Sequence, residues 1–307
     1  MRTLRFHEHG APLDVLRLED AEPPEPASGM VRVRVEACGL TPADWALCGG
    51  LFPGDLPRGI GLEVAGTVDA VGDGVTGVGI GDPVFGPAPF TGPTAGASEQ
   101  AVLEMWFPRP PGLDPAGAAA LPMAVETACR GLDALGVRDG MTVLVHGAGT
   151  TVGYAAVQMA LQRGARVVAT AGETYAGALR AAGAEVTGHG DGMAERVAAL
   201  AGGPVDLALD TAPVSGALPA LVRTVRAPEH VLTVSDFDAA RKLGVRFSGP
   251  GGEGVMSHHV LGEYARLAAE GRFSIPVART FALEDWRMAA ELSQSGRARG
   301  KLVLEIG

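Results

Sequence analysis

Five short aliphatic runs alternate with alanine-rich stretches between residues 143 and 236, and this alternation constrains the fold more than any other feature. The runs have the length and composition of buried strands, at 143–147, 165–171, 184–188, 205–212 and 230–236. The stretches between them favour helices, at 153–163, 175–182, 191–201 and 214–226. Strands that alternate with helices form βαβ units, in which the strands pair in parallel. The sequence therefore predicts an α/β fold built on a parallel sheet.

The two flanks of this segment have a different texture. Residues 30–40, MVRVRVEACGL, alternate apolar and charged side chains as a half-buried strand does. A proline-rich break lies at 108–115, and the last part of the chain predicts helix, strand, helix and strand, at 258–273, 274–281, 283–296 and 300–306. We therefore expect a β-rich domain made of residues 1–112 and 263–307, with a nucleotide-binding domain, 113–262, inserted into it.

Composition excludes several classes of partner. The net charge of −10 argues against a surface for nucleic acid or anionic membrane. No uncharged apolar run approaches the roughly 20 residues of a membrane span, and the N-terminus has no apolar signal core. The three cysteines form no CxxC pair, and their odd number argues against a disulfide framework. We expect a cytoplasmic protein.

The stretch TVLVHGAGTTVGYAAVQMALQRGARVVATAG, residues 142–172, reads as strand, glycine turn, helix and strand. Gly147 permits a tight turn out of the strand, and Gly153 lets the helix approach the sheet closely. Gly149 lies between them, and Thr150 and Thr151 offer hydroxyls to phosphate oxygens. This context predicts a dinucleotide site in which the pyrophosphate lies at the helix N-terminus, although a plain tight turn has the same local pattern.

The end of the second strand bears on the choice of cofactor. An acidic residue at this position usually binds the free ribose 2′-hydroxyl of NADH, but here Ala171 and Gly172 occupy it. Glu173 follows and either takes that role or starts the next helix. The absence of an acid at Ala171 and Gly172 favours NADPH. NADH stays possible because no Arg or Lys follows before Arg180.

Several motifs together resemble the zinc-free quinone oxidoreductase branch of the medium-chain dehydrogenase/reductase superfamily. They are VRVEACGLTPADW, GLEVAGTVDAVGDGV, GDPVFG, AAALPMAVETACRGL, the glycine-turn stretch, VDLALDTAP and ARGKLVLEIG, and they span nearly the whole chain. The resemblance implies a GroES-like substrate domain, an inserted Rossmann domain and a cleft between them. It also implies hydride transfer from a nicotinamide and a homodimer.

Zinc-dependent members of the superfamily bind a catalytic metal with Cys, His and Cys. The matching positions here are Thr41, Leu62 and Met123, which are not a competent zinc ligand set. His258 and His259 are adjacent, and neighbours on a helix do not share a face. Without a Lewis acid, the accessible acceptors are quinones and α,β-unsaturated carbonyls, which take hydride at carbon and delocalise the charge.

The resemblance also assigns site residues. Thr41 is the candidate donor to the developing oxyanion, or else caps the loop before Pro42. Trp45, Phe52 and Phe90 form an apolar slot for a flat acceptor, or else belong to the core. The cofactor-binding set consists of the turn residues with Val152, the strand end at Ala171 and Gly172, and Thr127, Tyr175, His189, Ser235 and Lys301.

These observations predict a zinc-independent, NADPH-dependent reductase of quinones or enones. Two alternatives stay open. One is an enoyl-type reductase of a biosynthetic pathway, and the other is a non-catalytic nucleotide-binding sensor or structural protein, because fold does not settle function.

Overall fold

The alternating segment forms a six-stranded parallel sheet in a computed structural model that describes residues 1–249 and 251–307. The strand order is β11-β10-β9-β12-β13-β14. The strands are β9 Thr142–His146, β10 Arg166–Thr170, β11 Glu185–Thr187, β12 Leu207–Asp210, β13 Val231–Thr233 and β14 Arg246–Phe247. The predicted α/β fold class is confirmed.

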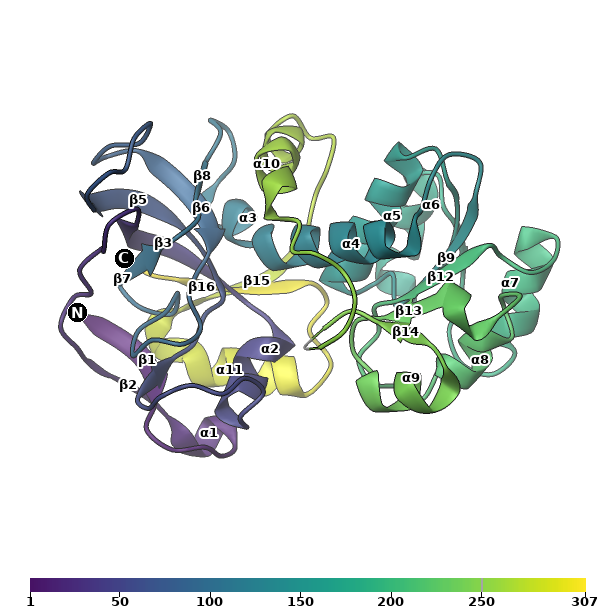
Figure 1. The fold of residues 1–307 in the computed structure, drawn as a ribbon, viewed down its shortest axis with the longest axis horizontal. Helices are drawn as coiled ribbons and strands as arrows, with labels where there is room; N and C mark the ends of the chain where they lie inside the picture. The colour runs from purple at the N-terminus through teal and green to yellow at the C-terminus, as the bar shows by residue number, and fades with distance from the viewer. Residues whose placement is uncertain (250) are drawn as a thin grey trace. The chain divides into compact units, whose positions relative to one another are not determined.

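Helices cover both faces of this sheet, as right-handed crossovers require when the strand order reverses at β9. Figure 1 shows α8 and α9 on the opposite side of the sheet from α5. The helices are α4 Pro122–Leu135, α5 Thr151–Gln162, α6 Glu173–Ala181, α7 Met193–Ala201, α8 Leu218–Val222, η1 Pro228–His230 and α9 Phe237–Leu243. The helix predicted over 214–226 is shorter because Pro219 fits only into a first turn.

The core of this region explains why its strands read as continuous aliphatic runs. Both faces of β12 are covered, and all four of its residues are buried. Leu144, Val168, Ala208 and Val231 come from four different strands and share one hydrophobic cluster. Helix α5 ends where the sequence predicts, because Gly164 has φ 79°, the left-handed conformation of a residue just past a helix end.

The chain divides into two compact units, which we call the flanking unit, Met1–Met123 with Leu261–Gly307, and the central unit, Ala124–Val260. The central unit is therefore an insertion, with limits that differ slightly from the predicted ones. The first boundary lies after Met123 instead of after residue 112, because helix α3 (Pro115–Ala119) packs against two strands of the flanking unit, β3 and β5.

The flanking unit contains two sheets. The smaller has the order β2-β1-β4, and the larger has the order β15-β16-β3-β5-β6-β8, with β7 also paired to β3. The strands are β1 Arg2–Phe6, β2 Leu16–Asp20, β3 Val31–Leu40, β4 Arg58–Gly59, β5 Glu63–Val71, β6 Pro83–Pro87, β7 Gln100–Leu103, β8 Phe107–Pro108, β15 Val277–Ala282 and β16 Lys301–Glu305. Strand β16 pairs with β3, so the end of the chain completes the first unit.

Short helices surround these sheets. They are α1 Pro12–Val15, α2 Pro42–Cys48, α10 Leu261–Ala269, η3 Leu283–Asp285 and α11 Trp286–Gln294; the 3-10 turn η2 His258–Val260 ends the central unit instead. The helix predicted over 258–273 is thus a 3-10 turn followed by a shorter α-helix. Of the helices in the described part of the chain, none is long and apolar enough to cross a membrane.

Candidate functional site

The predicted cofactor-binding residues of the central unit gather at the carboxyl ends of neighbouring parallel strands. The glycine turn follows β9, Ala171 follows β10, His189 follows β11 and Ser235 follows β13. Strand β9 has β10 on one side and β12 on the other, so the turn lies where the strand order reverses. In open parallel sheets, ligands bind outside the carboxyl ends of the strands at this switch point.

Two glycines of the turn are required by close backbone approaches. Gly147 has φ 75°, and a Cβ atom there would lie 2.6 Å from the Ala212 nitrogen. At Gly153 a Cβ would be nearest to the Gly147 carbonyl oxygen, and it would lie 2.5 Å from Thr211 Oγ1. Only glycine therefore lets the first turn of α5 lie against the strand ends, as the sequence predicts.

Thr150 is the N-cap residue of α5, and its hydroxyl is already engaged. Its Oγ1 accepts a hydrogen bond from the Gly153 N–H at 3.0 Å and donates to Thr211 Oγ1 at 3.3 Å. Thr151 is the first helical residue. In this structure the Thr150 hydroxyl caps the helix and directs its proton toward Thr211, and its donation to a phosphate stays a prediction.

Backbone N–H groups at the start of α5 remain available instead. Those of Gly149, Thr151 and Val152 have no acceptor among residues 1–249 and 251–307. A Cβ at Gly149 would meet only the Tyr175 ring, at 3.8 Å, so the turn is open on the side of the Gly149 Cα. Free N–H groups at the positive end of a helix dipole are suited to bind the oxygens of a pyrophosphate.

His146 ends β9 directly beneath the turn. Its Nδ1 lies 2.7 Å from Thr170 Oγ1, which also accepts from the Gly147 N–H at 3.2 Å. Burial, with a smaller contribution from His189, lowers the pKa of His146 to about 4. The imidazole is therefore neutral at pH 7, and the Thr170 hydroxyl links it to the backbone of the turn.

The end of β10 carries no acidic side chain. Ala171 is buried, its N–H donates to the Thr187 carbonyl, and Gly172 is the N-cap of α6. Glu173 is the first residue of that helix, which matches the helix-start alternative. The strand end thus presents small residues where NADH-binding proteins commonly place an acid.

Arginine side chains lie beside this strand end, and Arg196 is one that sequence reasoning missed. The Arg196 guanidinium donates to Thr187 Oγ1 at 3.1 Å and to the carbonyls of Gly188, His189 and Asp191. Arg180 donates to the Val186 carbonyl at 3.3 Å. Among the described residues neither arginine forms an ion pair within 4 Å, and both guanidinium groups donate to backbone carbonyls.

The other predicted cofactor residues differ in how they are placed. The Tyr175 ring packs edge-on against Tyr154, with centroids 5.5 Å apart. Ser235 Oγ donates to the Ala212 carbonyl at 2.6 Å. Thr127 lies on α4, and its hydroxyl donates to the Glu126 carboxylate at 3.3 Å.

In the flanking unit, Thr41 caps helix α2. The Thr41 N–H and Oγ1 both donate to Asp44 Oδ2, at 2.6 and 2.8 Å, and the Gly61 N–H donates to Asp44 Oδ1 at 2.8 Å. Burial raises the pKa of Asp44 to about 6, although these three hydrogen bonds favour the carboxylate. The Thr41 proton is thus directed to Asp44, which supports the capping alternative.

Lys301 is buried in the flanking unit, where its ammonium forms an ion pair with the buried Glu63. The other Glu63 oxygen accepts from the Met123 N–H at 2.8 Å. This arrangement differs from the expected cofactor contact, because an ammonium enclosed with its own carboxylate is not presented to a ligand. In this structure Lys301 thus has a role inside the unit, and its contact with the cofactor stays a prediction.

The three positions that match a zinc ligand set offer a hydroxyl, an aliphatic side chain and a thioether. These are Thr41, Leu62 and Met123, and the Thr41 hydroxyl is already bonded to Asp44. Zinc sites in proteins use thiolate, imidazole and carboxylate ligands. The residues present do not fit a catalytic zinc ion.

The predicted aromatic slot separates into two parts. Trp45 is buried in the core, and its Nε1 donates to Ser293 Oγ at 2.8 Å, so the core alternative describes it. The rings of Phe52 and Phe90 pack together with centroids 5.0 Å apart, and Phe90 is 39% exposed. The buried Arg58 guanidinium donates to the carbonyls of both phenylalanines and holds the pair together.

Sequence signals existed for some of the missed residues. Thr41 and Asp44 have the spacing of a helix N-terminal capping box, which predicts their mutual hydrogen bonds. The pairing of Glu63 with Lys301 has no local signal, because 238 residues separate the two.

Comparisons with known proteins agree with this architecture. Residues 27–129 match the family model of the alcohol dehydrogenase GroES-like domain, and residues 183–304 match that of the zinc-binding dehydrogenase. A solved structure of the quinone oxidoreductase from Coxiella burnetii superposes with a TM-score of 0.84 at 27% identity, over 100% of this chain and 99% of that one. The predicted combination of a GroES-like domain with a Rossmann domain is confirmed.

Curated relatives are of two kinds. The spectinabilin polyketide synthase system protein NorB of Streptomyces orinoci is 35% identical over 299 residues, which are 91% of this chain and 13% of NorB. The quinone oxidoreductase of Rattus norvegicus is 39% identical over 178 residues, which are 56% of this chain and 53% of that protein. The chain thus matches about half the length of one relative and a small part of the other.

Three findings lead to one conclusion. They are the two family models at residues 27–129 and 183–304, the solved structure that matches the full length of the chain, and the quinone oxidoreductase relatives. The chain belongs to the medium-chain dehydrogenase/reductase superfamily and is similar to its quinone oxidoreductases.

Proposed function

We propose that the central unit binds NADPH at the carboxyl edge of its parallel sheet. The observation that carries this proposal is the start of α5, where three N–H groups have no acceptor in the described residues and the turn is open beside the Gly149 Cα. A pyrophosphate supplies the acceptors that these groups lack. Tyr175 and His189 are proposed to contact the rest of the cofactor.

The preference for NADPH rests on charge. A 2′-phosphate at the β10 end meets no acidic side chain at Ala171 or Gly172, while Arg180 and Arg196 lie beside the adjoining β11 end and form no ion pair among the described residues. NADH gains nothing from these cations, because its 2′-hydroxyl is neutral. We therefore propose tighter binding of NADPH than of NADH.

We propose that the protein reduces a quinone or an activated enone without zinc. When bound, the nicotinamide supplies the hydride. The protein orients the two reactants and provides weak hydrogen-bond donation to the developing oxyanion. Phe52 and Phe90 are the proposed contacts for a flat acceptor, and Thr41 is the proposed donor, although in this structure its hydroxyl must leave Asp44 to serve.

A second candidate is an enoyl-thioester reductase, and the extent of the similarity to NorB favours it. That match covers 91% of this chain, whereas the match to the rat quinone oxidoreductase covers 56%. An enoyl thioester is an activated enone, so the same zinc-free hydride chemistry applies to it.

Oxidation of NADPH across a panel of acceptors tests these proposals. Turnover of a simple quinone supports the first candidate, and turnover of only a crotonyl-type thioester supports the second. Tight NADPH binding with no turnover of any quinone, enone or thioester would indicate instead a non-catalytic nucleotide-binding protein.

We also propose that the chain forms a homodimer in a reducing compartment such as the cytoplasm, as the family resemblance implies. Light scattering tests the oligomeric state.

A further inference from the structure

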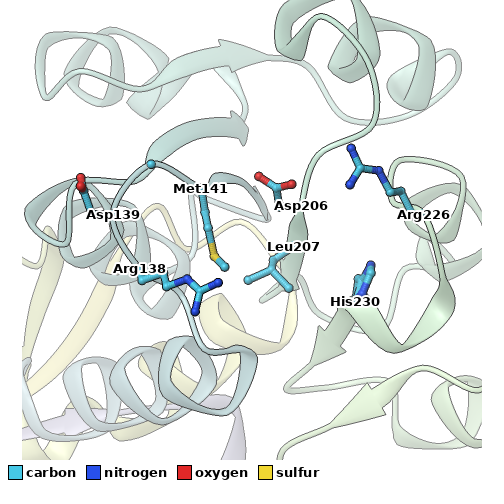
Figure 2. Close-up of a pocket in the computed structure, with 8 residues that line it drawn as sticks. Arg138, Asp139, Met141, Asp206, Leu207, Arg226 and His230 are labelled. Atoms are coloured by element: carbon cyan, nitrogen blue, oxygen red, sulfur yellow. The ribbon is translucent and has the colours of Figure 1, made fainter.

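A pocket lies at the amino edge of the central sheet, opposite the glycine turn. It has a volume of about 440 Å³ and is lined by residues that precede or begin three neighbouring strands, β9, β12 and β13 (Figure 2). Strand β9 has five residues, so roughly 16 Å of strand separates the two edges. The pocket is therefore distinct from the proposed cofactor site and goes beyond the proposed function.

Positive side chains stand on two sides of this pocket. Arg138 reaches into it from the loop before β9, and Arg226 faces it from the segment before β13 (Figure 2). In the described part of the chain neither guanidinium has a carboxylate or carbonyl acceptor. An exposed arginine is ordinary, but two that line one pocket without acceptors provide forked donors for an oxyanion.

A single carboxylate faces the space between the two arginines. Asp206 lies there in Figure 2, and its Oδ2 accepts the Thr142 N–H at 2.8 Å, so its position is fixed by the edge of the sheet. The neighbouring Asp139 carboxylate instead packs against Gly164. The two arginines and two aspartates that line the pocket balance in formal charge, and they offer two forked donors together with one fixed acceptor, Asp206, that suits a ligand hydroxyl.

His230 lines the same pocket. Its Nδ1 is buried and has no hydrogen-bond partner among the described residues. A buried ring nitrogen without a hydrogen-bond partner is unfavourable. Met141 and Leu207 supply apolar surface to the pocket.

We propose that this pocket binds a small phosphate monoester that also carries a hydroxyl group. The phosphate is bound by Arg138 and Arg226, the hydroxyl donates to Asp206, and the carbon chain lies on Met141 and Leu207. The volume is within the range of small-molecule sites, about 300–1,000 Å³. The expected ligand class is a short polyol phosphate, distinct from the dinucleotide at the other edge.

The test uses the full chain labelled with ¹⁵N and two probes, inorganic phosphate and glycerol 3-phosphate. We expect saturable amide shifts at Met141 and Leu207, with glycerol 3-phosphate bound at least threefold more tightly than phosphate. Arg138→Gln and Arg226→Gln should each weaken both probes by fivefold or more. Asp206→Asn should tighten phosphate, because a repelling charge is removed, and should abolish the preference for the hydroxyl-bearing probe.

The matched control is Arg272→Gln, an exposed arginine of the flanking unit, and it should leave both affinities unchanged. Three results would overturn the proposal. They are shifts confined to Gly149, Thr151 and Val152, equal weakening by the control variant, and affinities that do not respond to either pocket arginine. Thermal unfolding of each variant shows whether a lost affinity reflects a lost fold.

Discussion

Adding one methyl group at Gly153 tests the two roles of the glycine turn, which are close packing and anion binding. In Gly153→Ala, the new Cβ would lie 2.5 Å from Thr211 Oγ1 and 2.8 Å from the Ala148 Cα, with the Gly147 carbonyl oxygen nearer still. Two of these three neighbours are backbone atoms that cannot rotate away. The first turn of α5 must therefore move off the strand ends, and its free N–H groups move with it.

The expected loss of NADPH affinity follows from the hydrogen bonds that these N–H groups donate. Each hydrogen bond to a charged acceptor contributes about 1.5–3 kcal/mol. If the displacement removes one of the three bonds that Gly149, Thr151 and Val152 are proposed to donate, NADPH binding weakens by roughly 10- to 150-fold. Overpacking itself costs about 1–3 kcal/mol of folding stability, partly offset because alanine is the better helix former. Leucine at this position should weaken binding further.

Fluorescence titration measures the affinity for NADPH, and urea unfolding measures the folding stability. Gly177→Ala is the matched control, because Gly177 lies within α6 and a Cβ there meets no atom within 4 Å. It should leave the affinity unchanged and stabilise the fold by about 0.5–1 kcal/mol. A Gly153→Ala protein that binds NADPH as the wild type does would refute the assignment of this turn.

Four further predictions test other parts of the molecule. Arg196→Gln and Ala171→Asp should each reduce the ratio of NADPH to NADH affinity, the second by repulsion of the 2′-phosphate; an unchanged ratio would place the 2′-position elsewhere. Thr41→Val should destabilise α2 by about 1 kcal/mol and slow quinone reduction by no more than about tenfold, with enone reduction slowed more because an enolate localises its charge; rates equal to those of the wild type with both acceptors would remove Thr41 from the reaction. Because the pKa of His146 lies at about 4 in the folded protein against 6.5 normally, up to about 3 kcal/mol of stability is present above pH 6.5 and lost as the pH falls through 4; His146→Asn should lack this component in unfolding curves recorded across that range. Activity should be indifferent to EDTA, and stoichiometric zinc whose removal abolishes turnover would contradict the zinc-free mechanism.

The sequence predicts the parts of the structure that depend on local pattern. The strand and helix periodicity of the central unit, the turn at Gly147 and the helix end at Gly164 all follow from residue type and spacing. The contacts that fill the flanking unit do not. Trp45 has the same apolar character whether it lines a slot or the core, and only its contact with Ser293 decides.

Electrostatic contacts between residues distant in the sequence leave no local signal. Lys301 and Glu63 are distant in the sequence, and nothing local indicates that each neutralises the other inside the protein. Arg196 gives no signal in the local pattern because it lies on α7, beyond the strand end that usually determines cofactor preference. Such contacts depend on topology, which brings β11 and α7 beside the end of β10.

The pairing of β16 with β3 has a consequence for how the protein folds as it is synthesised. Strand β3 leaves the ribosome early, but its neighbour β16 lies about 260 residues later, after the whole central unit. The central unit is continuous in sequence and can acquire its structure first. Until the last strand arrives, one edge of β3 stays unpaired near its carboxyl end, and unpaired edges recruit other chains. Conditions that slow synthesis past residue 260 should therefore favour aggregation through this edge.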